Sequence, residues 1–355
     1  MRRSPEGFSS PEAESPRAEI DAELKKIEFS VLLEQYEPTY LGSGGEQIVF
    51  NVKGHPKVVA KVDRFSVERF VKLNRDEGRE PDALSDDLRE KVGKTMRKEF
   101  DSLATLREYF GDAVLREKRF LQKIPVTKQL LLEVSEHPDW FDHLEDGPTE
   151  LWAVVRVQER LPKEALDTNT AVGLAFDYLE KYPRKFDAQT VKRWTVDLLD
   201  GTGASAREYL SRALPNYPHF LAEYDRDQRF RERVKAFAQA AVRFTGETTE
   251  ILDLAGTDNA IVYRSNDGWK LVLPDARYPS RHLWDDATEA VGEILRGHPI
   301  GLTASNRLLN AINYTRFINA LNAFCGSPDR LRLAREPIEP KYDALARELS
   351  GSFRS

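Results

Sequence analysis

The stretch that decides the fold is residues 41–50, which read LGSGGEQIVF and contain three glycines. Glycine has no Cβ, so the backbone N–H groups of such a loop can approach phosphate oxygens closely. In a dinucleotide-binding loop the following residues would open a helix. Here Ile48, Phe50 and Val52 alternate with other residues as in a strand, which predicts a glycine-rich β-hairpin. A hairpin of this kind that binds no ligand is the simpler alternative.

The next apolar segment carries a lysine at its centre. Residues 58–62 read VVAKV and are expected to form a strand that holds Lys61. Burial of an ammonium group is costly unless it is paired. Glu99, on a helix expected over 96–110, is an available partner, and such a pair would position the lysine for nucleotide phosphates. The alternative is a lysine on an edge strand that points to water.

Polar residues in the second half of the chain could meet around one hairpin. Residues 251–262 read ILDLAGTDNAIV, with Asp253 after apolar residues and Asn259 before the hairpin predicted by the turn at 265–268, SNDG. Asp275 follows the second strand of that hairpin, so it would lie at the same end as Asn259. A turn rich in Asp and Asn for local hydrogen bonding is the alternative.

The order of these features resembles the protein-kinase-like superfamily. The match covers about residues 38–300 and consists of the order of the features. A glycine-rich hairpin comes first, followed by a strand with a lysine, a helix with a glutamate and an apolar strand. After them come a long helix, a loop with Asp and Asn, a second hairpin and a final Asp. The resemblance implies an α+β, two-lobed protein-kinase-like fold with a small β-rich lobe and a larger helical lobe. It also implies ATP and Mg²⁺ as cofactors.

The resemblance assigns roles to single residues. Gly42, Gly44 and Gly45 would cover the phosphates of the nucleotide, and Val49 would pack over its adenine. Lys61 would contact the α- and β-phosphates. The hinge between the lobes would be formed by Gln158, Glu159 and Leu161. Glu99 would hold Lys61 in place. Asp253 would be the catalytic base, and Asn259 and Asp275 would hold Mg²⁺.

The chain also departs from the kinase pattern. Gln47 stands where the third loop glycine is usual, and Ile251-Leu252 replaces the His-Arg pair before the base. Kinases place the metal-binding Asn about five positions after the base, whereas Asn259 follows Asp253 by six positions. After Asp275 comes Ala276-Arg277 in place of Phe-Gly, and little room is left for a long activation segment. This pattern is closer to aminoglycoside or small-molecule phosphotransferases, or to atypical bacterial-type kinases.

Several functions therefore stay open. The first is a phosphotransferase that acts on a protein Ser/Thr or a small-molecule hydroxyl. The second is an impaired pseudokinase, a module that binds a nucleotide or a partner, in which Leu254 takes the position of the base. Asp258 is a further candidate for the base. A third reading is a nucleotidyl-transferring relative that binds the nucleotide inverted.

Composition limits the classes of function. The chain has 355 residues, which favours about two domains. Its formal net charge of −6 provides no overall basic field for nucleic acid or an anionic membrane surface. The single cysteine, Cys325, excludes an intrachain disulfide and favours a reducing, cytoplasmic compartment, with secretion as an effector left open. No apolar run approaches the roughly 20 residues that span a bilayer.

We expect four regions along the chain. They are a disordered tail at 1–17, an N-lobe at 18–160 with insertions at 66–95 and 127–149, a helical C-lobe at 161–326 that contains the hairpin, and a tail with a short helix at 327–355. Periodicity predicts two strands near 114–126 and 150–158. It predicts helices over 18–36, 96–110, 167–181, 187–200, 227–245, 286–296 and 305–325.

Overall fold

The fold was analysed in a computed structural model. It describes residues 14–27, 33–39, 47–80, 82–134, 138–142, 144, 146–174, 206–254, 259–274, 289–290, 292–293, 298 and 302–331. The chain divides into two compact units. Unit 1 comprises Met1–Asp101 and Leu115–Pro162, and unit 2 comprises Ser102–Val114 and Lys163–Ser355. Helices and antiparallel strands are both present, so the α+β class expected from the sequence is confirmed. Within the described residues, no helix has the length and apolar character needed to cross a membrane.

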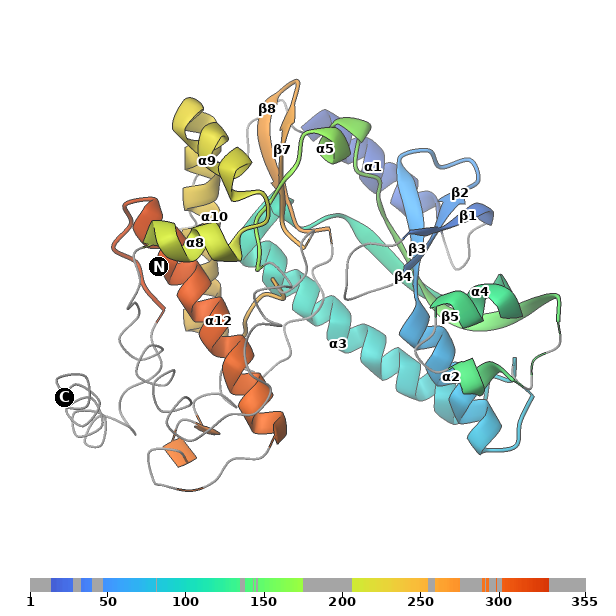
Figure 1. The fold of residues 1–355 in the computed structure, drawn as a ribbon. Coiled ribbons are helices and arrows are strands. Elements are labelled where there is room, and N and C mark those ends of the chain that lie inside the picture. The colour runs from blue at the N-terminus through green and yellow to red at the C-terminus, as the bar shows by residue number, and fades with distance from the viewer. Residues whose placement is uncertain are drawn as a thin grey trace, which may run out of the picture. The chain divides into compact units, whose positions relative to one another are not determined.

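Unit 1 is built on a five-stranded antiparallel sheet with the strand order β1-β2-β3-β5-β4 (Figure 1). Its strands are β1 (Leu33–Thr39), β2 (Gln47–Val52), β3 (Val58–Asp63), β4 (Glu117–Thr127) and β5 (Pro148–Glu159). The strands expected near 114–126 and 150–158 are therefore confirmed as β4 and β5. Strand β3 lies in the middle of the sheet and pairs on both sides.

One face of this sheet is apolar. Ala60, Val62, Val155 and Val157 are fully buried, whereas Lys61 and Arg156, which alternate with them, are half-buried. Three helices cover this face: α1 (Glu14–Lys26), α2 (Arg64–Asp76) and α4 (Lys128–Val134). Burial of these aliphatic side chains contributes about 25 cal/mol per Å² of apolar surface, which makes this face the core of unit 1.

Helix α1 is fixed to the sheet by apolar and polar contacts. Its buried residues Ile20 and Leu24, followed by Ile27, join the core of unit 1. The Lys57 side chain forms an ion pair with Glu19. We expected residues 1–17 to be a disordered tail, but α1 already begins at Glu14.

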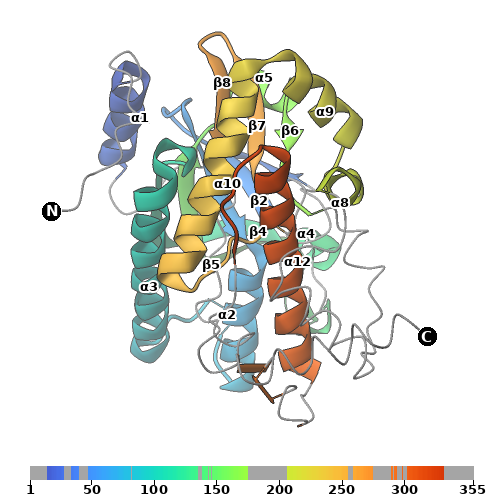
Figure 2. The ribbon, with the colours of Figure 1, turned by 90° about the vertical axis from the view of Figure 1, so that its left-hand side faces the viewer.

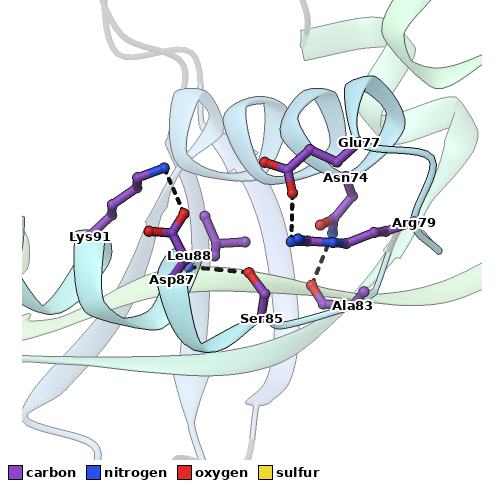
Figure 3. A network of polar contacts seen from close by, with 8 residues as sticks. All are labelled: Asn74, Glu77, Arg79, Ala83, Ser85, Asp87, Leu88 and Lys91. Carbon is purple, nitrogen blue, oxygen red and sulfur yellow. Dashed lines mark hydrogen bonds and ion pairs between the residues drawn. The ribbon is translucent and has the colours of Figure 1, made fainter.

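The junction between α2 and α3 (Asp86–Phe110) is held by local polar contacts (Figure 3). The hydroxyl of Ser85 accepts a hydrogen bond from the N–H of Leu88 at 3.2 Å and so caps α3. The Asn74 side chain donates to the carbonyl of Ala83 at 2.9 Å. The figure also draws the ion pairs Arg79–Glu77 (2.6 Å) and Lys91–Asp87 (2.7 Å). Helices α2 and α3 therefore occupy most of the segment 66–95, which was expected as an insertion.

One helix predicted in unit 1 was wrong in its second half. The helix expected over 18–36 ends at Lys26, and Leu33–Thr39 forms β1. Pro38 is tolerated there because β1 is an edge strand of the sheet. The segment 127–149, expected as an insertion, contains α4 and a 3-10 helix over Pro138–Phe141.

Unit 2 packs helices around an aromatic core. The helices are the C-terminal part of α3, α5 (Lys163–Asp167), α8 (Ala206–Ala213), α9 (Tyr217–Arg226), α10 (Gln228–Thr248) and α12 (Leu302–Phe324). Helices α10 and α12 contact each other and lie side by side in Figure 2. Asp227 caps α10 because its carboxylate accepts from the N–H groups of Arg229 (2.8 Å) and Phe230 (3.2 Å). The helices expected over 227–245 and 305–325 are confirmed, whereas α8 and α9 were not foreseen.

A small three-stranded sheet, β6-β7-β8, completes the described part of unit 2. Its strands are β6 (Thr170–Ala171), β7 (Ile261–Ser265) and β8 (Gly268–Val272). The hairpin predicted from Asp267-Gly268 is confirmed, with Gly268 at φ 107°, a value that glycine adopts readily. The prediction of a helix over 167–181 is wrong at Thr170 and Ala171, because these residues form β6 and pair with β7. The helix expected over 187–200 lies outside the described residues.

Candidate functional site

The predicted site residues fall into three groups. Gly42, Gly44, Gly45 and Asp275 lie outside the described residues, and Glu99 lies on α3 with its side chain outside them. Unit 1 holds Lys61, Val49, Gln158, Glu159 and Leu161. Unit 2 holds Asp253 and Asn259.

Lys61 lies at the centre of the large sheet. On β3 it is paired with Val49 of β2 on one side and with Arg156 of β5 on the other. The alternative of an edge-strand lysine is therefore wrong. Lys61 is half-buried, whereas its neighbours Ala60 and Val62 are fully buried on the apolar face. Alternation along β3 thus directs the lysine to the opposite face of the sheet.

That opposite face carries a row of cations. Lys61 on β3, Arg156 on β5 and Arg119 on β4 occupy mutually opposite positions on three neighbouring strands. We call these three residues the cation row. Residues directly opposite each other on antiparallel strands project from the same face. The cation row therefore places three positive side chains next to one another.

The outer end of the cation row is fixed by an ion pair. The Arg119 Nε lies 2.6 Å from the Glu117 Oε1, and the side chains are only 6% and 5% exposed. In the sheet register, Glu117 lies opposite Gln158, which is 1% exposed. This face is therefore buried in part. Sequence reasoning did not single out Arg156, Arg119 or Glu117, although Arg156, which stands between Val155 and Val157, was an available signal of the same kind as Lys61.

The end of β5 was expected to offer backbone hydrogen bonds to adenine. The N–H of Glu159 donates to the carbonyl of Arg116 at 2.9 Å, and the N–H of Arg160 donates to the carbonyl of Lys57 at 2.8 Å. Both donors are thus used within unit 1. Among the backbone hydrogen bonds of the described residues, none uses the N–H of Leu161. The N–H of Glu159, one of the three expected hinge residues, is therefore used within the fold of unit 1.

In unit 2, Asp253 lies in a loop that is anchored at consecutive residues. The Asn259 side chain donates to the carbonyl of Asp253 at 2.9 Å. The N–H of Leu174 donates to the carbonyl of Leu254 at 2.6 Å. The backbone of Leu252 hydrogen-bonds to the hydroxyl of Tyr314 on α12. The loop is therefore held on both sides of Asp253.

Burial sets Asp253 apart from its neighbours. Ile251, Leu252 and Leu254 are buried in the core of unit 2, whereas Asp253 is half-buried. This pattern gives a carboxylate that has partial access to solvent on a segment anchored by the core. Buried Leu254 cannot supply base chemistry, so Asp253 is the carboxylate that the described loop offers. The other candidate, Asp258, lies outside the described residues.

The hydrogen bond from Asn259 also orients its amide. A carbonyl can only accept, so the Nδ2 of Asn259 must face the Asp253 carbonyl. The Oδ1 is then the side-chain atom suited to a hard cation, and Mg²⁺ prefers oxygen ligands. Of the two residues expected to hold the metal, the described one has chemistry that fits this ion.

Tyr314 supports the loop from the core. It is 2% exposed, and its hydroxyl lies 3.1 Å from the hydroxyl of Thr245 on α10. Burial raises the pKa of Tyr314, so the phenol is neutral and able to donate or accept a hydrogen bond. Tyr314 thus links α10, α12 and the segment that precedes Asp253. The sequence showed only an apolar helical pattern there, and nothing in it distinguished this tyrosine from core packing.

Comparisons of the chain with protein-family models, with curated proteins and with solved structures found no match.

Proposed function

We propose that this chain is an ATP- and Mg²⁺-dependent phosphotransferase with a two-lobed, protein-kinase-like fold. The phosphoryl acceptor would be a hydroxyl of a protein Ser/Thr or of a small molecule. The observation that carries the proposal is the hydrogen bond from Asn259 to the Asp253 carbonyl. It brings the expected base and an expected metal ligand together even though they are six positions apart rather than about five.

The position of Lys61 supports the same proposal. Protein kinases carry their phosphate-binding lysine on the third strand of the small lobe. Lys61 lies on β3, the central strand of a sheet of order β1-β2-β3-β5-β4, and α3 follows between β3 and β4. Glu99, the expected partner of Lys61, belongs to that helix.

Each residue has a defined role in the proposed reaction. Lys61 binds phosphate oxygens, and Asn259 together with Asp275 holds the cation. Asp253 accepts the proton of the acceptor hydroxyl while the hydroxyl oxygen bonds to the γ-phosphorus. The bond between that phosphorus and the bridging oxygen breaks, and ADP leaves with the electron pair. When bound, Mg²⁺ would offset the negative charge of the phosphates.

A pseudokinase is the second candidate. It is favoured by Ile251 and Leu252, which stand where kinases have a His-Arg pair and are both buried in the core. These side chains supply no polar group beside Asp253. Such a chain would bind the nucleotide without turnover.

Incubation with γ-labelled ATP and Mg²⁺ separates the candidates. Wild type would be compared with Lys61→Ala, Asp253→Asn and Asp275→Ala, and Lys53→Ala in the exposed turn between β2 and β3 is the control. Transfer of label that is lost in the three site variants and kept in the control supports the phosphotransferase. Stabilisation by ATP–Mg²⁺ without transfer supports the pseudokinase. If ATP–Mg²⁺ neither raises the melting temperature nor reacts, both candidates are wrong.

A further inference from the structure

Two residues of unit 1 are bonded both to α1 and to the end of β5. Lys57 lies just before β3, and Arg116 lies just before β4. The carbonyl of Lys57 accepts a hydrogen bond from the N–H of Arg160 at 2.8 Å. The carbonyl of Arg116 accepts one from the N–H of Glu159 at 2.9 Å. These two bonds fix the segment at which the proposed function places the adenine of the nucleotide.

Further polar groups of Lys57 and Arg116 bind acidic side chains of α1. The Lys57 ammonium forms an ion pair with Glu19. The Lys57 N–H donates to the carboxylate of Glu23 at 3.3 Å. The Arg116 guanidinium lies 3.8 Å from the carboxylate of Asp21. Lys57 and Arg116 therefore each connect α1 to the end of β5 through the atoms of a single residue.

A third polar contact and an apolar surface complete the attachment of α1. Lys118 of β4 donates to the carbonyl of Ile27 at 2.6 Å, just beyond the C-terminal end of the helix. A cation at this end also suits the negative end of the helix dipole. Ile20, Leu24 and Ile27 are buried in the core of unit 1. The apolar contacts hold α1 on the sheet, and the polar contacts fix where it lies relative to the strand ends.

We propose that α1 positions the nucleotide-binding end of β5 and thereby regulates the affinity for the nucleotide. This inference rests on the proposed function and adds a means of controlling it. Lys57 and Arg116 are positioning residues, which act through the backbone of residues 159 and 160. The side chains of their ion pairs with α1 are between 36% and 57% exposed, so each pair is weak by itself and is screened by salt. Docking of α1 can therefore change while the core of unit 1 stays folded.

Coupling between two sites acts in both directions. If docked α1 favours binding of the nucleotide, then bound nucleotide favours docked α1 by the same factor. A helix that only stabilises the fold lacks this property, because the ligand would leave its local docking unchanged. Protection of α1 by the nucleotide is therefore the readout that distinguishes a positioning role from a structural one.

Hydrogen exchange followed by mass spectrometry tests the inference in the full chain. Wild type is compared with Lys57→Glu, which reverses the charge that faces Glu19 and Glu23. Lys53→Glu makes the same change at an exposed position of the same turn and is the matched control. Glu19→Lys combined with Lys57→Glu restores opposite charges across the ion pair. Each protein is measured with and without ATP–Mg²⁺, and the central strand β3 is the internal reference for global unfolding.

We expect Lys57→Glu to speed exchange about fivefold in α1 and in residues 148–160, the size of effect that exposed ion pairs give. The Kd for ATP–Mg²⁺, measured by calorimetry, should rise by a similar factor. ATP–Mg²⁺ should slow exchange in α1 of wild type relative to β3. Lys53→Glu should match wild type, and the charge swap should recover part of the loss. Circular dichroism would confirm folding, and Lys57→Met replaces Lys57→Glu if that variant does not fold.

The outcomes separate this inference from the function on which it rests. If wild type binds ATP–Mg²⁺ but the ligand leaves exchange in α1 unchanged, the inference is wrong and the proposed function stands. The same holds if Lys57→Glu speeds exchange in α1 and not at residues 148–160, or leaves α1 itself unchanged. If wild type binds no ATP–Mg²⁺, both proposals fail.

Discussion

The buried hydrogen bond between Tyr314 and Thr245 allows a quantitative prediction. Both side chains are almost completely buried, and their hydroxyl oxygens lie 3.1 Å apart between α10 and α12. Tyr314→Phe removes the phenol oxygen with little change in shape. It leaves the hydroxyl of Thr245 and the backbone of Leu252 without this partner. A buried group that loses its hydrogen bond costs about 1–3 kcal/mol, so we expect the free energy of unfolding to fall by about that amount.

A double-mutant cycle shows whether the loss comes from this contact. Thr245→Val is nearly isosteric and should cost about 1 kcal/mol, from the same unmade hydrogen bond. Once Tyr314 is Phe, Thr245→Val no longer breaks the contact and should cost less. We therefore expect a coupling energy of about 1 kcal/mol between the two positions.

Urea unfolding followed by circular dichroism measures the four members of the cycle. The buried Phe120 of β4 offers a control, because Phe120→Leu changes packing in the core of unit 1, away from the hydroxyl pair. It should be additive with Thr245→Val. Additivity of Tyr314→Phe and Thr245→Val within about 0.3–0.5 kcal/mol would refute the reasoning.

Three further predictions concern other parts of the molecule. Glu117→Gln leaves the buried guanidinium of Arg119 without its carboxylate. The free energy of unfolding, measured with urea, should fall by about 3–5 kcal/mol. A loss below about 1 kcal/mol would mean that solvent reaches the pair. Gly268→Ala forces a side chain into φ 107° and should cost more than about 1 kcal/mol of stability, whereas an unchanged urea midpoint would contradict the strained turn. Burial and the hydrogen bond to Glu247 raise the pKa of Tyr109 to about 12, above the usual value near 10. The unfolded chain then loses this proton first, so stability should fall between about pH 10 and 12, and Tyr109→Phe should abolish that part of the fall.

Local signals in the sequence predicted several elements correctly. Asp267-Gly268 between apolar runs marked the β7–β8 hairpin, and alternation marked β4 and β5. The apolar stripe that includes Phe230, Val234 and Phe237 marked α10, because helical spacing of large side chains is a strong pattern.

Elements that depend on tertiary contacts were harder to predict. Residues 33–36 belonged to the helix expected over 18–36, yet Leu33–Thr39 forms β1 because it pairs with β2 along its length. Most residues of segment 66–95 are polar or charged, so the sequence shows only a weak helical pattern there. The few buried residues that fix α2 to the sheet include Val67 and Val71. The stability of these elements comes from partners that are distant in the sequence.

The same division applies to the candidate site. Lys61, Asp253 and Asn259 stood out because polar residues in apolar surroundings are unusual. The register that aligns Arg156 with Lys61 depends on how β3 pairs with β5, and residues 64–147 separate the two strands. No local pattern contains that information.

The packing of α1 has a practical consequence for protein preparation. Ile20, Leu24 and Ile27 cover aliphatic side chains of the sheet in unit 1. A shortened protein that begins at residue 28 would leave that surface in contact with water. Contiguous exposed apolar surface promotes self-association. Helix α1 thus protects the protein against aggregation. Its removal should reduce solubility even if the catalytic activity of the remaining protein is unchanged.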